Sequence, residues 1–154
     1  MLSTTDFLPN SAFLSGMGLI PSSASGRVIY RYKSVVKHKG VIIGADESGE
    51  WWVLHNHPQT ALDLISFTDF VKGQRWYFDL KKTSLPLEQV LENAYSLFER
   101  GLRYRVFTNN CQHSASLVAY GKRRSEDLVR FFRGLALASP GGILLVRLLL
   151  RLFR

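Results

Sequence analysis

The order of residue patterns along the chain constrains the fold more than any other feature of the sequence. Between about residue 26 and residue 80, short stretches rich in β-branched and aromatic residues are separated by polar turns, which is typical of strands. From about residue 84 onward, apolar residues recur with the three- to four-residue spacing of helices. Strands followed by helices predict an α+β domain in which an antiparallel β-sheet packs against helices.

Five segments are expected to form strands. The first three are "GRVIYRYKS" (Gly26–Ser34), "VVKHKGVIIG" (Val35–Gly44) and "WWVLH" (Trp51–His55), and the polar loop "ADESGE" joins the second and third into a hairpin. The first strand alternates, with apolar and aromatic residues on one face and mainly basic residues on the other. Two shorter strands, "LISFTDF" and "QRWYFDL", follow.

Three helices are expected after the strands. "SLPLEQVLENAYSLFERG" carries one apolar stripe and ends at Gly101, which suits a C-terminal cap. "CQHSASLVAYG" is expected to stop at Gly121. "SEDLVRFFRGLALA" begins at Ser125 as the N-cap, with two acidic residues beside the positive helix end. The stretch "SPGG" (Ser139–Gly142) then separates these helices from the terminal "ILLVRLLLRLFR".

Cys111 is the only cysteine of the chain, and it stands at the expected start of a helix, directly after Asn109 and Asn110. The thiolate is the reactive form of cysteine, and a helix N-terminus stabilises it. Both asparagines suit helix capping, and their amides can donate hydrogen bonds to an oxyanion. These features favour a nucleophile, and the alternative is a small buried hydrophobic residue without chemistry.

A nucleophilic cysteine needs a base, which is normally a histidine. His113 is a poor base for Cys111, because helix positions two apart point roughly 200° away from each other. His38 and His55 can lie side by side on adjacent strands of the hairpin, and a helix packed on the sheet would bring Cys111 up to them. His57 is two residues from His55 and is an alternative candidate for the second histidine of the site. The histidines lack the ligand spacing of a metal site, so no metal is expected.

Three segments resemble, in order, the motifs of the lecithin–retinol acyltransferase-like family. "NCQHSASLVAYGKRRSEDL" resembles the Asn-Cys-Glu-His-Phe block of that family, with its following helix, Tyr-Gly and basic turn, and "YRVFTNN" resembles the lead-in to the block. "HKGVIIG" resembles the segment of the first histidine, and "WVLH" the strand that ends in the second. The similarity covers about Gly26–Leu128. It departs from the family at Lys39, where an aromatic residue is usual, at Gln112 in place of Glu, and at Ser114 in place of Phe.

The resemblance implies a circularly permuted papain-like fold in which the histidine strands precede the cysteine helix. By position, Cys111 is the nucleophile, His38 the base and acid, and His55 the group that orients His38. Asn110 matches the Asn before the family's cysteine. Gln112 directly follows Cys111, and both Asn110 and Gln112 are expected to lie near the oxyanion. The implied activity is that of a thiol acyltransferase or phospholipase, which works through a thioester on a phospholipid or other acyl donor and needs no cofactor.

Two other functions stay open at this point. A thiol amidase or peptidase of the same permuted papain-like class would use the same residues on peptide or cell-wall amides. A non-enzymatic protein that binds a membrane or a partner would keep a degenerate site, and Cys111 would then resist alkylation at neutral pH. The sequence does not decide between these alternatives, and it leaves the acyl donor and acceptor unassigned.

The C-terminal segment carries most of the net charge of +8, because residues 122–154 contain eight basic and two acidic residues. In the terminal twelve residues, Arg147, Arg151 and Arg154 share one helical face, and the other nine residues are apolar. Such a helix is about 18 Å long, too short for a hydrocarbon core of about 30 Å. It is typical of an interfacial helix that binds an anionic membrane surface. No nucleic-acid-binding signature is present, so no nucleic-acid partner is expected.

These observations predict a flexible N-terminal arm over residues 1–25, a catalytic domain of the lecithin–retinol acyltransferase-like type over residues 26–138, and an amphipathic membrane-associating helix over residues 139–154. A length of 154 residues with 46% hydrophobic content suits one ordinary domain with a real core. A single cysteine allows no internal disulfide, so we expect a cytoplasmic protein that is peripherally associated with membranes.

Overall fold

The computed structural model describes residues 9–34, 36–83, 85–101, 103–105 and 109–138, together with Leu144 and Arg147. Its elements are, in chain order, α1 (Pro9–Gly16), β1 (Val28–Lys33), β2 (Val36–Ala45), β3 (Trp51–His57), β4 (Ala61–Ser66), α2 (Phe67–Val71), β5 (Trp76–Phe78), α3 (Leu87–Glu99), α4 (Cys111–Tyr120) and α5 (Glu126–Ala138). The α+β class is confirmed. Arg151 and Arg154 lie outside the described residues.

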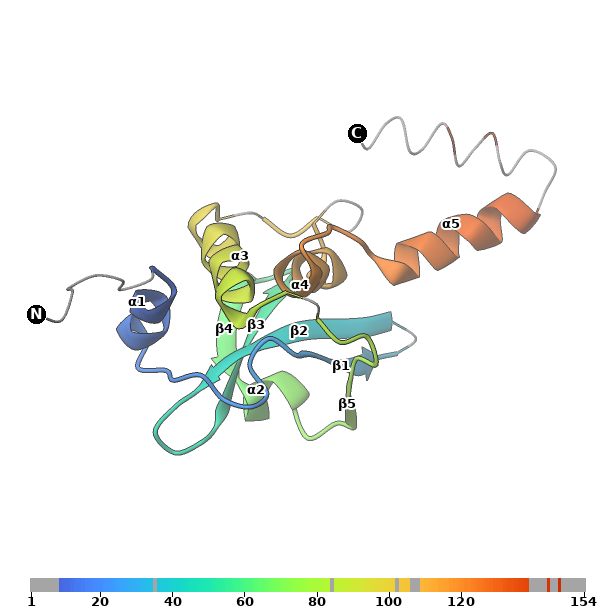
Figure 1. Ribbon diagram of the computed structural model, residues 1–154. Coiled ribbons are helices and arrows are strands. Elements are labelled where there is room, and N and C mark those ends of the chain that lie inside the picture. The colour runs from blue at the N-terminus through green and yellow to red at the C-terminus, as the bar shows by residue number, and fades with distance from the viewer. Residues whose placement is uncertain are drawn as a thin grey trace, which may run out of the picture.

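The five strands form one antiparallel sheet in the order β4-β3-β2-β1-β5 (Figure 1). The hairpin of β2 and β3 that the sequence predicts is present, and it places Gly40 opposite His55. On the other side of β2, His38 lies opposite Arg31 of β1. The register therefore brings both histidines and Arg31 to neighbouring positions at one end of the central strands.

Helices cover the two faces of the sheet unequally (Figure 1). α3 and α4 pack over one face, where Val41 and Ile43 of β2 join Leu54 in the larger core. The short α2 covers the other face, where Phe70 packs with Ile42 and other apolar residues. Because side chains alternate along a strand, His38 shares the α2 face with Ile42, whereas Lys39 shares the α4 face with Val41.

The face of β1 that carries mainly basic residues in the sequence is covered at its centre. Ile29 is fully buried and Arg31 is buried on that side of the strand. The physical reason is the position of β1 between β2 and β5, where α2 covers the face that alternation alone assigns to solvent. Arg31 is held there by a hydrogen bond from its Nε to the carbonyl oxygen of Phe70.

The segment "LISFTDF" does not form one strand. β4 ends at Ser66, and α2 begins at the next residue. The hydroxyl of Ser66 accepts a hydrogen bond from the N–H of Asp69 at 3.1 Å, which caps the helix. The apolar residues of this segment favour a strand, but the cap at Ser66 starts a helix instead. The helix places Phe70 against the sheet.

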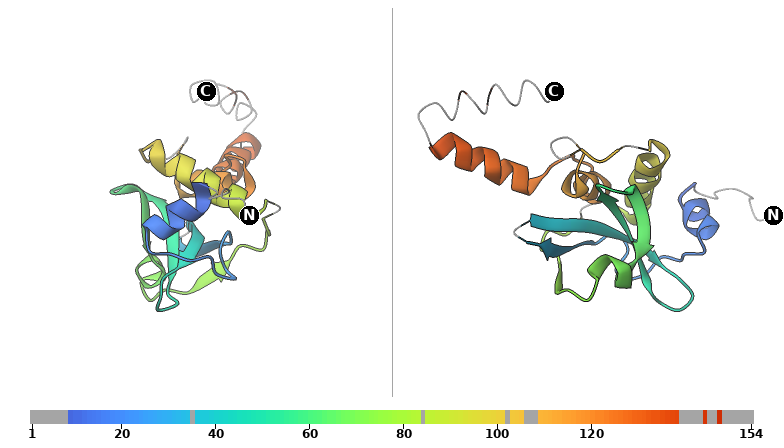
Figure 2. Two further views of the ribbon diagram at one scale, coloured as in Figure 1. Left: turned by 60° about the vertical axis from the view of Figure 1, so that its left-hand side comes forward. Right: turned by 180° about the vertical axis from the view of Figure 1, so that it is seen from behind.

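α4 begins after Asn110, its N-cap, and ends at Gly121, whose φ of 68° is left-handed. At the N-terminal end of the domain, Phe13 and Leu14 of α1 are buried, and the ring of Phe13 packs against Tyr95 of α3. α5 extends away from the sheet (Figures 1 and 2), and Leu137 near its end is 85% exposed. Among the helices that the structure describes, none combines the length and apolarity needed to cross a bilayer.

Candidate active site

The thiol of Cys111 lies at the N-terminus of α4, against the backbone of β2. The residue is 5% exposed, and its Sγ donates a hydrogen bond of 3.8 Å to the carbonyl oxygen of Lys37. Asn110 caps the helix, since its Oδ1 accepts from the N–H groups of Gln112 at 3.0 Å and His113 at 3.1 Å. The cap fixes the start of α4, so the sulfur sits beside the residue that precedes His38.

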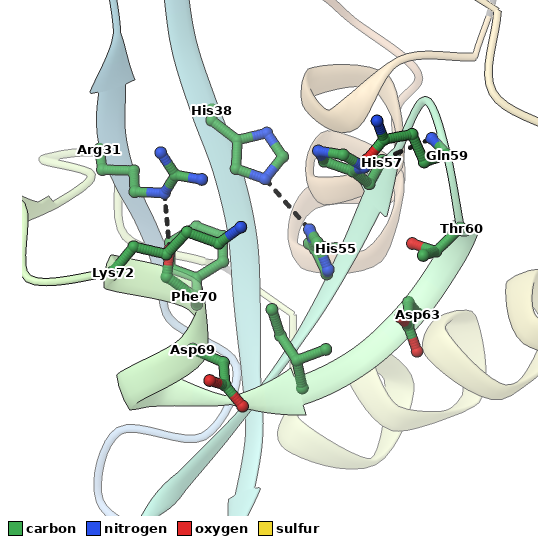
Figure 3. A pocket seen from close by; sticks show the side chains of 11 residues that line it. Arg31, His38, His55, His57, Gln59, Thr60, Asp63, Asp69, Phe70 and Lys72 are labelled. Atoms are coloured by element: carbon green, nitrogen blue, oxygen red, sulfur yellow. Dashed lines mark hydrogen bonds between the residues drawn. The ribbon is translucent and has the colours of Figure 1, made fainter.

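His38 and His55 form a hydrogen-bonded pair on the α2 face of the sheet (Figure 3). Nε2 of His38 lies 3.0 Å from Nδ1 of His55, and both rings are buried. The ring of Phe70 stacks on His38 with centroids 5.4 Å apart. Gly40 leaves room for this packing, because a Cβ there would lie 3.0 Å from Cε2 of Phe70. The predicted neighbourhood of the two histidines is therefore present.

The paired histidines line a polar pocket of about 280 Å³, which we call the histidine pocket. Figure 3 shows side chains from β1, β2, β3, β4 and α2 around it. Its lining residues are Arg31, His38, His55, His57, Gln59, Thr60, Asp63, Ile65, Asp69, Phe70 and Lys72. His57 lies at a ring-centroid distance of 5.9 Å from each of the other two histidines. In the described part of the chain, no three side chains of metal-binding type are arranged to hold a metal ion.

Burial keeps both paired histidines uncharged. It lowers the pKa of His38 to about 3, and the neighbouring His55 and Arg31 lower it further. Burial also lowers the pKa of His55 to about 4, although the charge of Asp63 opposes the shift. At neutral pH each ring therefore has one protonated and one unprotonated nitrogen, and an unprotonated nitrogen is what a general base requires.

Cys111 lines a separate cavity of about 620 Å³, which we call the thiol groove. Its lining residues are Val36, Tyr104, Asn110, Cys111, Gln112, Ser125, Asp127, Leu128, Arg130 and Phe131. Among the described residues, none lines both cavities, and the thiol has no hydrogen bond to a histidine. The two cavities lie on either side of the end of β2, with the sulfur beside the backbone of Lys37 and Lys39 and the ring of His38 on the α2 face.

The thiol is protonated in the resting protein. Burial raises the pKa of Cys111, and the N–H groups of Lys39 and Gln112 beside the sulfur offset this only in part. Burial lowers the pKa of the Arg31 guanidinium, and the charge that a Cys111 thiolate carries opposes that shift. The resting site thus holds a neutral thiol and neutral imidazoles, with the buried Arg31 on the side of the histidines.

Comparison with known proteins supports the motifs found in the sequence. Residues 54–124, which include His55 and Cys111, match the model of the family described as lecithin retinol acyltransferase. The chain is therefore similar to this family over that segment. It is also similar to phospholipase A and acyltransferase 3 of Mus musculus, with 22% identity over 144 residues that cover 79% of this chain and 86% of the relative. The resemblance predicted from the sequence is confirmed.

Gln112, which replaces the Glu of the lecithin retinol acyltransferase-like motif, ties three elements together. Its Nε2 donates to the carbonyl oxygen of Lys37 at 3.1 Å and to Oδ2 of Asp127 at 2.5 Å. Its Oε1 accepts from the hydroxyl of Ser125 at 3.2 Å and from the N–H of Asp127 at 3.1 Å. These four bonds use the amide fully, so Gln112 joins α4 to β2 and α5 beside the thiol.

Lys39, which replaces the family's aromatic residue, points to the α4 side of β2. Its Nζ lies 2.7 Å from Oδ2 of Asp79 and 3.0 Å from Oε2 of Glu126, and the side chain is buried. Two carboxylates compensate one buried cation, which is the condition under which a buried lysine stays charged. The ion pair with Glu126 also fixes the first turn of α5.

Ser114, which stands at the position of the family's Phe, makes room for a buried asparagine of β3. Nδ2 of Asn56 donates to the hydroxyl of Ser114 and to the carbonyl oxygen of Asn109, each at 3.0 Å. Asn56 is fully buried, and its role was missed at the sequence level. One sequence signal could have identified Asn56. Side chains alternate along β3, so Asn56 is expected on the same face as Leu54, and a polar residue on that buried face needs hydrogen-bond partners.

Proposed function

We propose that this protein is a thiol acyltransferase or phospholipase that forms a thioester on Cys111, with His38 as its base and acid and His55 as the orienting group. The observation that carries the proposal is the position of the thiol, at the N-terminus of α4 and hydrogen-bonded to the backbone next to His38. Similarity to the lecithin retinol acyltransferase family and to a phospholipase A and acyltransferase supports the class of reaction. The permuted papain-like arrangement, histidine strands before cysteine helix, is part of this proposal.

The hydrogen bond between the histidines is compatible with the tautomers that the reaction needs. If Nε2 of His38 carries the proton and donates to Nδ1 of His55, then Nδ1 of His38 has the free lone pair. In the proposed reaction the Cys111 side chain leaves the carbonyl oxygen of Lys37 and gives its proton to this nitrogen, which requires the sulfur to move toward His38 from its separate cavity. His55 thereby keeps His38 in the productive tautomer, a role that the more exposed His57 lacks, since its Nδ1 instead accepts from the N–H of Gln59.

Acyl transfer then proceeds in two balanced halves. The sulfur forms a bond to the acyl carbon, the carbon–oxygen bond of the ester breaks, and the leaving alcohol takes the proton from His38. In the second half, His38 removes a proton from water or from an acceptor amine or alcohol, whose oxygen or nitrogen attacks the thioester. The carbon–sulfur bond breaks and the thiol regains its proton.

The oxyanion needs donors that are not already committed to the helix cap. The N–H groups of Gln112 and His113 donate to Asn110, whose own amide donates to Ser125 at 3.3 Å. We assign the oxyanion to the N–H of Cys111 and the hydroxyl of Tyr104, which lines the thiol groove. Burial and the charge of Cys111 raise the pKa of Tyr104, so its hydroxyl keeps the proton that it donates.

The reaction is proposed to take place at an anionic membrane surface. The basic and apolar C-terminal segment supports this location, and phospholipids are the acyl donors that the similarity to a phospholipase suggests. Of the three arginines assigned to membrane contact, Arg147 is described, and its side chain is exposed. Arg151 and Arg154 complete the same face in the sequence.

The proposal is tested by intact-mass spectrometry after incubation with vesicles of phosphatidylcholine and phosphatidylserine. We expect one added acyl group on the wild-type protein, none on Cys111→Ser, and a much smaller fraction on His55→Gln than on His57→Gln. Wild-type protein that neither gains an acyl group nor releases fatty acid overturns the proposal. Cleavage of amide substrates without action on lipid esters would support the amidase alternative.

A further inference from the structure

Much of the lining of the thiol groove is apolar or aromatic. These lining residues are Val36 of β2, Tyr104, and Leu128 and Phe131 of α5. Two of these side chains are poorly covered, since Val36 is 49% exposed and Phe131 is 57% exposed. A run of exposed apolar side chains that begins at a buried thiol is costly in water, and it suits a hydrocarbon ligand.

The polar residues of the groove are committed to each other. Gln112, Ser125 and Asp127 form the hydrogen bonds that join α4 to α5. The amide of Asn110 also donates to Ser125. The two ionic side chains that line the groove, Asp127 and the exposed Arg130, lie 3.8 Å apart and partly compensate each other. The lining residues outside this bonded group are apolar or aromatic, apart from Cys111 itself.

The wall formed by α5 is fixed in place by the first turn of that helix. Glu126 pairs with the buried Lys39, and Asp127 accepts from the N–H of Lys37 at 3.2 Å. Leu128 and Phe131 follow on the same side of the helix, three residues apart. The distance from the thiol to these two side chains is thus set by polar contacts to β2 rather than by apolar packing of α5 on the sheet.

The histidine pocket offers a ligand the opposite environment. Arg31, Lys72, Asp63 and Asp69 place four ionic side chains around a smaller space. Burying a hydrocarbon chain there would remove charged groups from water without compensation. Of the two cavities that meet at the end of β2, the thiol groove is the one suited to an acyl chain.

We propose that the thiol groove is the acyl-chain subsite of the protein, and that Leu128 and Phe131 of α5 set the length of chain that it accepts. The inference rests on the proposed function, because it takes Cys111 as the nucleophile. It adds the route of the chain, which runs from the sulfur outward between the end of β2 and the first two turns of α5. Chain-length preference is then a property of α5.

The test uses p-nitrophenyl esters in mixed micelles with a neutral detergent, so that no anionic membrane surface takes part. Hydrolysis of p-nitrophenyl acetate, hexanoate, decanoate and palmitate is measured for the wild-type protein and for Leu128→Trp, Phe131→Ala and Leu137→Trp. We expect Leu128→Trp to lower the ratio of kcat/KM for decanoate to that for acetate by about tenfold or more, because the larger ring fills the groove. Phe131→Ala is expected to raise the same ratio for palmitate. Leu137, on the opposite face of α5, is the matched control and should leave the ratios unchanged.

The outcomes separate this inference from the proposed function. If no ester is hydrolysed in a Cys111-dependent way, the proposed function fails and the inference fails with it. If hydrolysis depends on Cys111 but neither Leu128→Trp nor Phe131→Ala changes the chain-length profile, the acyl-chain subsite is overturned and the nucleophile stands. Should Leu128→Trp lose its circular dichroism signal, Phe131→Ala decides, because this side chain is mostly exposed and its truncation leaves no buried cavity.

Discussion

His38 and His55 share a hydrogen bond of 3.0 Å between Nε2 of the first ring and Nδ1 of the second. Only one of these two nitrogens can carry the shared proton, so the tautomer of each ring determines that of the other. Because burial lowers the pKa of both rings, the pair is neutral at pH 7. The thiol beside them is also neutral, since burial raises its pKa. The resting site therefore lacks the thiolate–imidazolium pair that activates many cysteine nucleophiles.

The first prediction concerns the reactivity of Cys111 with iodoacetamide. Only the thiolate is alkylated, and the pKa of Cys111 is raised by burial, so the rate should be low at pH 7 and should rise through pH 9 and above. Slow alkylation at pH 7 is therefore shared with a degenerate site, and the acyl adduct on Cys111 is the result that separates the two. The measurement is the alkylation rate by mass spectrometry across pH 5 to 10, with Cys111→Ser as the blank. A plateau of fast alkylation between pH 5 and 8 would show a thiolate–imidazolium pair and contradict the neutral resting site.

The second prediction is that the paired histidines destabilise the fold in acid. Below about pH 6.5 the unfolded chain binds protons on both rings, whereas the folded pKa values of about 3 and about 4 keep the native rings neutral. The free energy of unfolding therefore rises with pH in this window and falls on acidification. Between pH 7 and pH 5, His38→Gln should lose about 2 kcal/mol less than the wild type, as measured by urea denaturation. Equal losses in both proteins would refute the depressed pKa of His38.

The neighbourhood of His38 and His55 could be predicted from the sequence because it depends on local rules. Their strands are joined by a short loop, and the register of a hairpin with alternating side chains places both rings on one face. Helix α4 could be predicted equally well, since its N-cap and its C-terminal glycine are sequence signals. A cysteine and two histidines with these surroundings were therefore recognisable before the fold was known.

The burial of Arg31, the separation of the two cavities and the partners of Lys39 depend on packing between segments that are distant in the chain. No local sequence pattern encodes such packing. Arg31 belongs to the mainly basic face of its strand, yet α2, some forty residues later in the chain, buries it. The separate cavities of Cys111 and His38 follow from the face on which α4 packs, and that choice was not visible in the spacing. Lys39 was noted as a departure from the family, but its partners, Asp79 and Glu126, come from later elements.

The third prediction is that Gln112→Glu, which restores the residue usual in the family, destabilises this protein. The amide donates to Oδ2 of Asp127 and to the carbonyl oxygen of Lys37, and a carboxylate there would face two acceptors. We expect a loss of about 2–3 kcal/mol in the free energy of unfolding at pH 7. The double variant Gln112→Glu/Asp127→Asn restores a donor and should recover much of the loss. If urea denaturation shows the single variant to be as stable as the wild type, the four-bond role of Gln112 is wrong.

The fourth prediction concerns the buried cation. Lys39→Met leaves the carboxylates of Asp79 and Glu126 without their partner, and breaking a buried pair on one side costs about 3 kcal/mol. Burial alone would raise the pKa of Asp79, but the hydrogen bonds from Lys39 and from the N–H of Lys81, together with the nearby lysine charges, outweigh it and lower the pKa. The loss should therefore shrink as acid protonates this carboxyl. Denaturation at pH 7 and pH 3 measures both effects. The double variant Lys39→Met/Asp79→Asn should recover part of the stability, and a double variant less stable than Lys39→Met would contradict this account.

The fifth prediction compares one substitution at two glycines. In Gly40→Ala the new Cβ would lie 2.5 Å from Cγ1 of Val53 and 3.0 Å from Cε2 of Phe70, so the packing beneath His38 must shift. We expect a cost of about 1–3 kcal/mol in the free energy of unfolding, together with reduced acyl transfer, because Phe70 stacks on the His38 ring. Gly134→Ala meets nothing within 4 Å in the interior of α5, and it should be neutral or stabilising by up to about 1 kcal/mol. Thermal denaturation followed by circular dichroism gives both values. A Gly40→Ala protein as stable and active as the wild type would show that the close packing of His38, Phe70 and Val53 does not constrain the site.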